Sequence, residues 1–315
     1  MNCYIWPAFF KQVMIKELAR KLLPSTARQK VSALYHEQKL FKAARVLAQA
    51  KGMSEVLDEK TFDTLMAAYP VGERMSYDND SVKHRGDERA NEMMEVMNRY
   101  GKGGFSDVLE LGSGEGMVCA ALQQNGFKAT AIEYREDDFD SRAKTAGVSL
   151  LKMDAANLTF EDESFDFVFS YNCYEHFPSP EKVFQESLRV LRKGGLMSVR
   201  FAPLYHSPFG AHAYNIIGIP YCQFLFDKMF LNKWIAENSA EKLVIDDTLN
   251  RWHINQFREL FKKQFSDKAV VHSYEEFRLP HFADLIIQHP LCFKNKITSV
   301  DDLVVSEIHA VIEKK

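Results

Sequence analysis

The residues of this sequence that could do chemistry are concentrated in one glycine-rich turn and the acids around it. An apolar stretch, residues 107–111, ends just before Gly112, and Gly114 and Gly116 follow at alternate positions. Glycine has no Cβ atom, so the main chain of such a turn can approach a ligand closely. A second apolar stretch ends on Glu133, whose oxygens can accept both hydroxyls of a ribose. A strand, a glycine turn, a helix and a strand with a terminal acid predict half of a nucleotide-binding unit.

The spacing of the glycines indicates which nucleotide this turn fits. A dinucleotide fingerprint needs a third glycine or alanine three residues after the second, and Met117 occupies that position. Glu110 stands where a dinucleotide site is normally apolar. The pattern Glu110-x-Gly112-x-Gly114-x-Gly116 resembles motif I of the class I S-adenosylmethionine (SAM) methyltransferases, of the small-molecule, type 11-like kind. An NAD(P)-dependent oxidoreductase on the same fold is the alternative that this spacing disfavours.

The resemblance covers residues 85–202 well and implies where SAM would bind. In the family, the main chain of motif I approaches the methionine part of SAM, and an acid at the position of Glu133 holds the ribose. The resemblance places Asp154 at the adenine amino group, Ala155 as a main-chain donor to the ring, and Asn172 beside the SAM amino and sulfonium groups. The implied cofactor-binding residues are Glu110, Gly112, Ser113, Gly114, Gly116, Glu133, Tyr134, Asp154, Ala155 and Asn172.

The acceptor chemistry is less constrained by the sequence. SAM carries its own leaving group, so the protein must align the acceptor and exclude water. A hydroxyl acceptor needs a base, and His176 is the first candidate because an imidazole has a pKa of about 6.5. The alternative is a structural histidine at a helix entrance. Further candidates are Tyr205, His206 and His212, in a segment that resembles part of some bacterial small-molecule methyltransferases, and Arg200 as a cation in the pocket. No ligand spacing predicts a metal site.

The elements that must position these residues alternate between strand and helix. This order predicts a Rossmann-like, doubly wound, mostly parallel seven-stranded α/β sheet. We expect an N-terminal helical extension over residues 1–80 and a methyltransferase domain over 81–315, with acceptor-binding insertions at about 203–248, after the fifth strand, and 278–298. The predicted strands are 107–111, 128–133, 149–152, 165–171, 196–201, 269–274 and 304–312. The predicted helices are 8–22, 25–50, 54–68, 82–99, 114–125, 137–145, 180–192 and 250–265.

Composition and charge restrict the compartment and the partners. The chain has 315 residues and a net charge of −3, which gives no overall attraction to nucleic acid. Five cysteines without a paired spacing predict reduced thiols of a cytoplasmic protein. Residues 11–45 carry nine basic and two acidic side chains, a charge of 9 − 2 = +7. That segment is compatible with peripheral contact to the inner face of a membrane, or with a helical cap whose basic face is solvated. Association into an oligomer is compatible with the same composition.

The expected function is methyl transfer from SAM to a hydroxyl or amine of a small-molecule or glycan acceptor. The N-terminal segment around residues 18–24 is similar to leader helices of bacterial surface-glycan enzymes, which favours surface-polysaccharide biosynthesis. A secondary metabolite or a quinone-like ring is the alternative acceptor. A non-catalytic SAM-fold subunit is disfavoured by the intact motif set. Nucleic-acid methylation is disfavoured because no base-flipping motif follows the fourth strand.

Overall fold

The computed structural model describes residues 25–72, 78–240, 243–245 and 249–315. The helix predicted over residues 8–22 lies outside these ranges. The chain forms two compact units. One comprises the described residues up to Ser54 together with Pro280–Lys294, and the other comprises the described residues of Glu55–Leu279 and Asn295–Lys315. Within the described residues no helix combines the length and the apolar character needed to cross a membrane.

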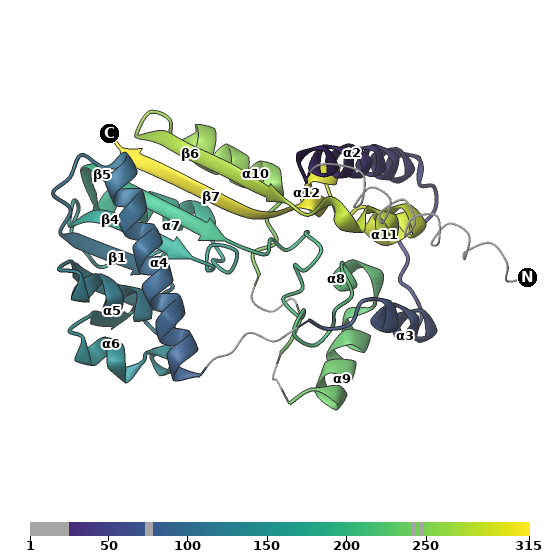
Figure 1. Ribbon diagram of the computed structural model, residues 1–315, viewed down its shortest axis with the longest axis horizontal. Helices are drawn as coiled ribbons and strands as arrows, with labels where there is room; N and C mark the ends of the chain where they lie inside the picture. Colours follow the sequence, from purple (N-terminus) through teal and green to yellow (C-terminus); the bar gives the residue numbers. More distant parts are fainter. Residues whose placement is uncertain (1–24, 73–77, 241–242, 246–248) are drawn as a thin grey trace, which may run out of the picture. The chain divides into compact units, whose positions relative to one another are not determined.

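The larger unit is built on a seven-stranded sheet with the order β3-β2-β1-β4-β5-β7-β6 (Figure 1). Five strands are parallel, and the last two pair antiparallel at one side. The fold class predicted from the sequence is therefore confirmed. The strands are β1 (Asp107–Leu111), β2 (Lys128–Glu133), β3 (Ser149–Lys152), β4 (Phe165–Tyr171), β5 (Leu191–Phe201), β6 (Ala269–Arg278) and β7 (Val305–Lys314).

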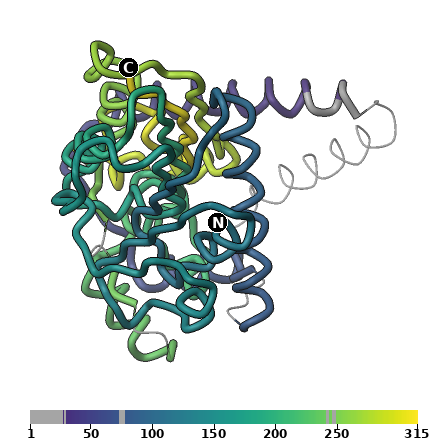
Figure 2. Tube along the Cα trace, turned by 90° about the vertical axis from the view of Figure 1, so that its left-hand side faces the viewer, coloured from purple at the N-terminus to yellow at the C-terminus, as the bar shows by residue number. Residues whose placement is uncertain are grey.

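Helices cover both faces of this sheet, because alternate side chains of the buried strands point to opposite faces. Along β4, Phe167 and Phe169 pack into one apolar cluster and Val168 into the other. The first cluster is closed by α4 (Asn79–Tyr100), α5 (Met117–Gln124) and α6 (Ser141–Thr145). The second is closed by α7 (Pro180–Val190) and α10 (Ile254–Glu259). Figure 1 and Figure 2 show α4, in blue, running along its face of the sheet.

The starts of α5 and β5 differ from the sequence prediction. The helix α5 begins at Met117 and not at Gly114, because Gly116 occupies the N-cap with a left-handed φ of 76°. The strand β5 begins at Leu191 and not at Leu196. Leu191 pairs with Phe165 ahead of a register shift, so the residues expected to end the preceding helix extend the strand instead.

Three further helices begin later in the chain than the sequence predicts. The helix α3 (Glu59–Ala68) begins later than residue 54, because Asp58 accepts a hydrogen bond from the Thr61 amide and caps it. The stretch 137–145 divides into a 3-10 turn (Glu136–Asp138) and α6. Asn250 does not cap α10: its side chain donates to the Tyr174 carbonyl and accepts from the Trp252 amide, and the helix begins at Ile254. A π turn, Leu260–Gln264, follows α10.

The insertion after β5 is part of the larger unit and packs against α3 through aromatic side chains. It contains α8 (Cys222–Leu225) and α9 (Lys228–Asn238). Phe62 of α3 is fully buried against Phe226, Phe230 and Trp234, with ring centroids 5.1–5.2 Å apart. The short helix α12 (Val300–Val304) then leads into β7. The smaller unit pairs α2 (Ser25–Gln49) with α11 (Ala283–Gln288), and Lys39 forms an ion pair with Asp284.

Candidate active site

The carboxyl ends of the parallel strands form one edge at which the predicted cofactor residues meet. The Gly112 and Ser113 amides both donate to the Ile132 carbonyl at 3.0 Å, which ties the glycine turn to the end of β2. The Met153 amide donates to the Glu133 carbonyl at 3.0 Å, which ties the end of β3 to the same edge. Since β1 and β4 are neighbours and the chain winds in opposite directions from them, this is the crevice where such sheets bind ligands.

The glycines of the turn are required for different structural reasons. All have left-handed φ values: 69° at Gly112, 51° at Gly114 and 76° at Gly116. A Cβ atom on Gly112 would lie 2.0 Å from the Cys173 sulfur, so this glycine allows β1 and β4 to end in contact. A Cβ on Gly114 would meet no atom within 4 Å. The position of Gly114 therefore faces open space, which a ligand can occupy.

Glu133 already interacts with the glycine turn. Its Oε2 accepts a hydrogen bond from the Gly114 amide at 2.9 Å, and its Oε1 accepts from the Tyr134 amide at 2.7 Å. A carboxylate oxygen has two lone pairs, so both oxygens can accept a further hydrogen bond from a ribose hydroxyl. The Tyr134 side chain is exposed at the same strand end.

The next two strand ends place the other predicted cofactor residues. Asp154 is exposed and accepts from the Ala156 amide at 2.9 Å and from the Asn157 side chain at 2.6 Å, while Ala155 is buried beside it. Asn172 is exposed and has a φ of 50°, and its amide donates to the Arg200 carbonyl at 2.7 Å. Both side chains thus lie at the cofactor edge. The Asp154 oxygens have further lone pairs that can accept hydrogen bonds from a ligand.

Two predicted cofactor residues of the glycine motif, Glu110 and Ser113, have buried side chains. Glu110 is 2% exposed, and burial raises the pKa of its carboxyl to about 8. Its Oε2 and the hydroxyl of Ser113 have no hydrogen-bond partner among the described residues. The open space at Gly114, an orphaned polar atom at Ser113 and two acids with spare lone pairs suit a ligand with an amino acid part, a ribose and an adenine, which SAM has.

A family model described as a methyltransferase domain matches residues 109–199, from β1 through β5. This chain carries a class I SAM-dependent methyltransferase domain. The matched residues include the glycine turn and the carboxyl ends of β1, β2, β3 and β4, and they stop two residues before the end of β5. The family match therefore covers the residues that form the cofactor edge.

Curated relatives of the methyltransferase domain align over the same part of the chain. An uncharacterized methyltransferase of a Mycobacterium species is 32% identical over 110 residues, which is 35% of this chain and 43% of the relative. A phosphoethanolamine N-methyltransferase of Caenorhabditis elegans is 40% identical over 67 residues, which is 21% of this chain and 14% of the relative. The chain therefore spans less than half of the length of these relatives.

Solved structures similar to this one include a protein from Pyrococcus horikoshii and a SAM-dependent methyltransferase from Methanosarcina mazei. The first has 17% identity and a TM-score of 0.44, and the match covers 82% of this chain and 100% of that chain. The second has 14% identity and a TM-score of 0.43, and covers 70% and 96% respectively. The fold assignment rests on the strand order of the methyltransferase domain itself.

Beyond β4 the structure brings His176 together with His212 of the insertion. Their rings meet edge to face with centroids 5.0 Å apart. His212 Nε2 lies 2.8 Å from the Pro203 carbonyl, which can only accept, so Nε2 carries the proton. Burial lowers the pKa of His212 to about 4, so its ring is neutral at pH 7.

The sequence analysis missed Glu175 as a member of this group. Its carboxylate is buried, Oε1 lies 4.0 Å from His176 Nε2, and burial raises its pKa to about 8. The available signal was its position directly before His176, a histidine already singled out as a candidate base.

The other three predicted catalytic residues have partners of their own. His206 is 5% exposed and stacks on His253 at 4.2 Å, and burial lowers its pKa to about 4. Arg200 pairs with Glu92 at 3.1 Å and with Glu307 at 2.7 Å, so two carboxylates match its charge. The Tyr205 ring lies against His206 and under the Arg251 guanidinium.

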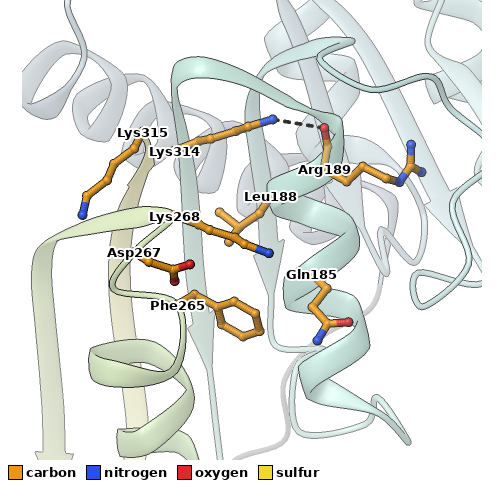
Figure 3. A pocket seen from close by; sticks show the side chains of 8 residues that line it. All are labelled: Gln185, Leu188, Arg189, Phe265, Asp267, Lys268, Lys314 and Lys315. Atoms are coloured by element: carbon orange, nitrogen blue, oxygen red, sulfur yellow. Dashed lines mark hydrogen bonds between the residues drawn. The ribbon is translucent and has the colours of Figure 1, made fainter.

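Among the described residues of the larger unit, pockets lie near both ends of β5. A pocket of about 470 Å³ adjoins the end of β5, and its lining includes Pro203, whose carbonyl holds His212. It is lined by Pro70, Gly72, Pro203, Phe209, Tyr214, Asn215 and Gly218. The other, of about 430 Å³, contains Lys314, which donates to the carbonyl of Arg189 near the end of α7 (Figure 3). Lys314 also donates to the carbonyl of Leu191, the first residue of β5. Only the first pocket lies at the cofactor edge.

Proposed function

We propose that this protein transfers a methyl group from SAM to a hydroxyl or amine of a small-molecule or glycan acceptor. The observation that carries the proposal is the placement of an aromatic pocket and the His176–His212 pair at the strand edge that also holds the glycine turn and Glu133. When bound, SAM supplies an electrophilic methyl group together with its own leaving group.

The residues of the chain would divide the work of binding and alignment. Glu133 and Asp154 would hold the ribose and the adenine through their unused lone pairs, and the main chain at Gly114 would lie against the amino acid part. The pocket lined by Phe209 and Tyr214 would hold the acceptor and exclude water. His176 is the partly exposed member of the histidine pair and would receive the acceptor proton directly or through its neighbours.

The pocket also supports the class of acceptor. Its volume of about 470 Å³ lies within the range of roughly 300–1,000 Å³ typical of small-molecule sites. An amine stays among the acceptors because one matched relative is named a phosphoethanolamine N-methyltransferase. A sugar of a surface polysaccharide remains our first choice of acceptor, with a secondary metabolite or quinone-like ring second.

The N-terminal basic segment belongs to the same proposal. We infer that residues 11–45 bring the enzyme to an anionic membrane surface at the inner face, where lipid-linked glycans are assembled. Exposed basic side chains on α2, among them Lys30, Lys42 and Arg45, support this inference.

The cofactor assignment is tested by calorimetry with SAM and with its demethylated product. Glu133→Ala should abolish binding of both, whereas Glu136→Ala, an exposed acid just beyond the same strand, should leave affinity unchanged. Normal SAM binding by the Glu133 variant would show that the ribose assignment is wrong. The acceptor is then identified by incubating the wild-type protein and SAM with a metabolite extract, and by searching for a product heavier by one methylene unit.

A further inference from the structure

Three potential ligands for a metal ion converge at the end of β4, although the sequence spacing predicted none. Glu175 and His176 are consecutive, and the fold of the insertion brings His212 to them. One ligand atom from each residue lies within 4.8 Å of the other two. We propose that Glu175, His176 and His212 form a site for a divalent first-row transition metal ion such as Zn²⁺.

The buried, unpartnered carboxylate oxygen of Glu175 is the first independent observation in favour of this site. Its side chain is 3% exposed, and its Oε2 has no hydrogen-bond partner in the described part of the chain. An unpartnered buried carboxylate oxygen costs free energy, so such atoms in folded proteins ordinarily have a ligand or a water. The main chain at Glu175 is held firmly, because its carbonyl accepts from the Asn250 amide at 2.9 Å.

His212 provides the second observation. Its Nε2–H donates to the Pro203 carbonyl, which fixes the proton there and leaves the lone pair on Nδ1. Histidines that bind metals almost always donate the other ring N–H to a carbonyl or carboxylate in this way. The residue also has a φ of 54°, a conformation that is costly for a side chain with a Cβ atom and that concentrates at functional sites.

The geometry and the donor set point to the kind of ion. Two imidazoles and one carboxylate suit Zn²⁺, Fe²⁺, Co²⁺ or Ni²⁺ better than Mg²⁺ or Ca²⁺, which prefer oxygen ligands. Ligands about 2.1 Å from one ion stand roughly 3.5 Å apart, so the three ligand atoms, which lie within 4.8 Å of one another, would move closer together by about 1 Å when an ion binds. Three protein ligands leave coordination positions open.

The location suggests what fills the open positions. The Pro203 carbonyl that orients His212 belongs to a residue lining the 470 Å³ pocket at the cofactor edge. An acceptor with two neighbouring oxygens, such as a vicinal diol or a hydroxy-carbonyl group, could bind the ion there and have the pKa of its hydroxyl lowered. With the ion bound, His176 would act as a metal ligand in place of the proton acceptor, because a neutral imidazole has a single lone pair. The ion's role in activating the acceptor rests on the proposed methyl transfer, whereas metal binding itself does not.

The site is tested with Zn²⁺ and full-length protein that has been treated with a chelator. Competition with a metal indicator should give a single tight site, and Zn²⁺ should raise the melting temperature. Glu175→Gln, His176→Gln and His212→Gln should each weaken Zn²⁺ binding at least about tenfold. His84→Ala, which removes an exposed histidine paired with Glu88 on α4, should leave the affinity unchanged.

The same preparations separate this proposal from the proposed function. Glu133→Ala should lose SAM and keep Zn²⁺, and the three site variants should lose Zn²⁺ and keep SAM. Because His176 is one-third exposed, His176→Gln should fold even where a buried substitution does not, as circular dichroism will verify. Unchanged Zn²⁺ affinity in folded His176→Gln, or no tight site in the wild type, overturns the metal proposal and leaves methyl transfer intact.

Discussion

Gly112 and Gly114 show that two glycine positions of one motif can have different structural roles. Both have left-handed φ values, which cost a residue with a Cβ atom about 1–2 kcal/mol. At Gly112 an added Cβ would also lie 2.0 Å from the Cys173 sulfur, whereas at Gly114 it would enter open space. One glycine therefore serves the contact between two strand ends, and the other serves the ligand.

We predict that Gly112→Ala lowers the free energy of unfolding by about 2–4 kcal/mol, because backbone strain and overpacking add. Gly114→Ala should cost about 1–2 kcal/mol of stability and yet weaken SAM binding strongly, since its Cβ fills the open space. Urea unfolding and calorimetry measure the two quantities. Equal stability losses with unaltered SAM binding by Gly114→Ala would contradict the division of roles.

Glu110 links the pH to the stability of the fold. Its carboxyl has a folded-state pKa of about 8, because burial disfavours the charged form, against about 4.3 in an unfolded chain. Between these values the folded state holds a proton that the unfolded state has released. Stability therefore falls as the pH rises through this window, by at most about 1.4 kcal/mol per pH unit from this group.

We predict that Glu110→Gln, which keeps the shape and cannot ionise, reduces this fall. The measurement is urea unfolding of the wild type and the variant from pH 5 to pH 8 without cofactor. The difference in stability between the two should shift in favour of the variant as the pH increases. A constant difference across the range would mean that Glu110 is ionised in the folded protein.

At the scale of elements, the contact between α4 and α5 depends on Gly86. A Cβ atom there would lie 2.9 Å from both the Cβ and the carbonyl oxygen of Met117, the first residue of α5. The two helices therefore meet at the point where the glycine turn becomes a helix. This contact fixes the start of α5, and through it the position of the turn.

In an exposed helix, replacing glycine by alanine stabilises by about 1 kcal/mol. We predict the opposite sign for Gly86→Ala, a loss of about 1–3 kcal/mol, because α4 and α5 must separate. Gly72→Ala is the matched control, since no atom lies within 4 Å of its added Cβ and its φ is not left-handed. Thermal unfolding of the two variants measures the change in stability. A Gly86→Ala variant more stable than the wild type would show that the two helices do not meet as described.

At the scale of the whole molecule, charge is distributed unevenly along the chain. Residues 11–45 have a charge of +7, so the remaining residues have −3 − 7 = −10. A basic segment of this kind is attracted to anionic lipid by about 1 kcal/mol for each basic side chain near the surface. The rest of the protein would be repelled by the same surface, which orients any contact.

We predict that the protein sediments with vesicles of anionic lipid and not with neutral ones, and that salt weakens the association. A variant with glutamine at Lys30, Lys42 and Arg45, all exposed on α2, should bind at least about tenfold more weakly. Glutamine at Lys152, Lys228 and Lys262, which are exposed outside the basic segment, provides a control of equal charge change. Absence of sedimentation with anionic vesicles would favour the helical-cap interpretation.

Much of the fold and of the cofactor edge was predictable because it depends on local patterns. The strands β1 to β4 have the predicted bounds, since each is a short buried apolar run between turn residues. Two of the element starts that were wrong depend on nonlocal partners: Leu191 extends β5 by pairing with Phe165, and Tyr174 takes the side chain of Asn250 away from a helix cap.

The sequence by itself determined the parallel sheet, the glycine turn, the acid that ends β2 and the acid that follows β3, because strand ends and their neighbours are adjacent in the chain. Only the tertiary structure decided that Arg200 is matched by two carboxylates, and that Glu175 and His176 meet His212. The physical reason is that burial and charge pairing depend on residues brought together across the fold, which no spacing along the chain records.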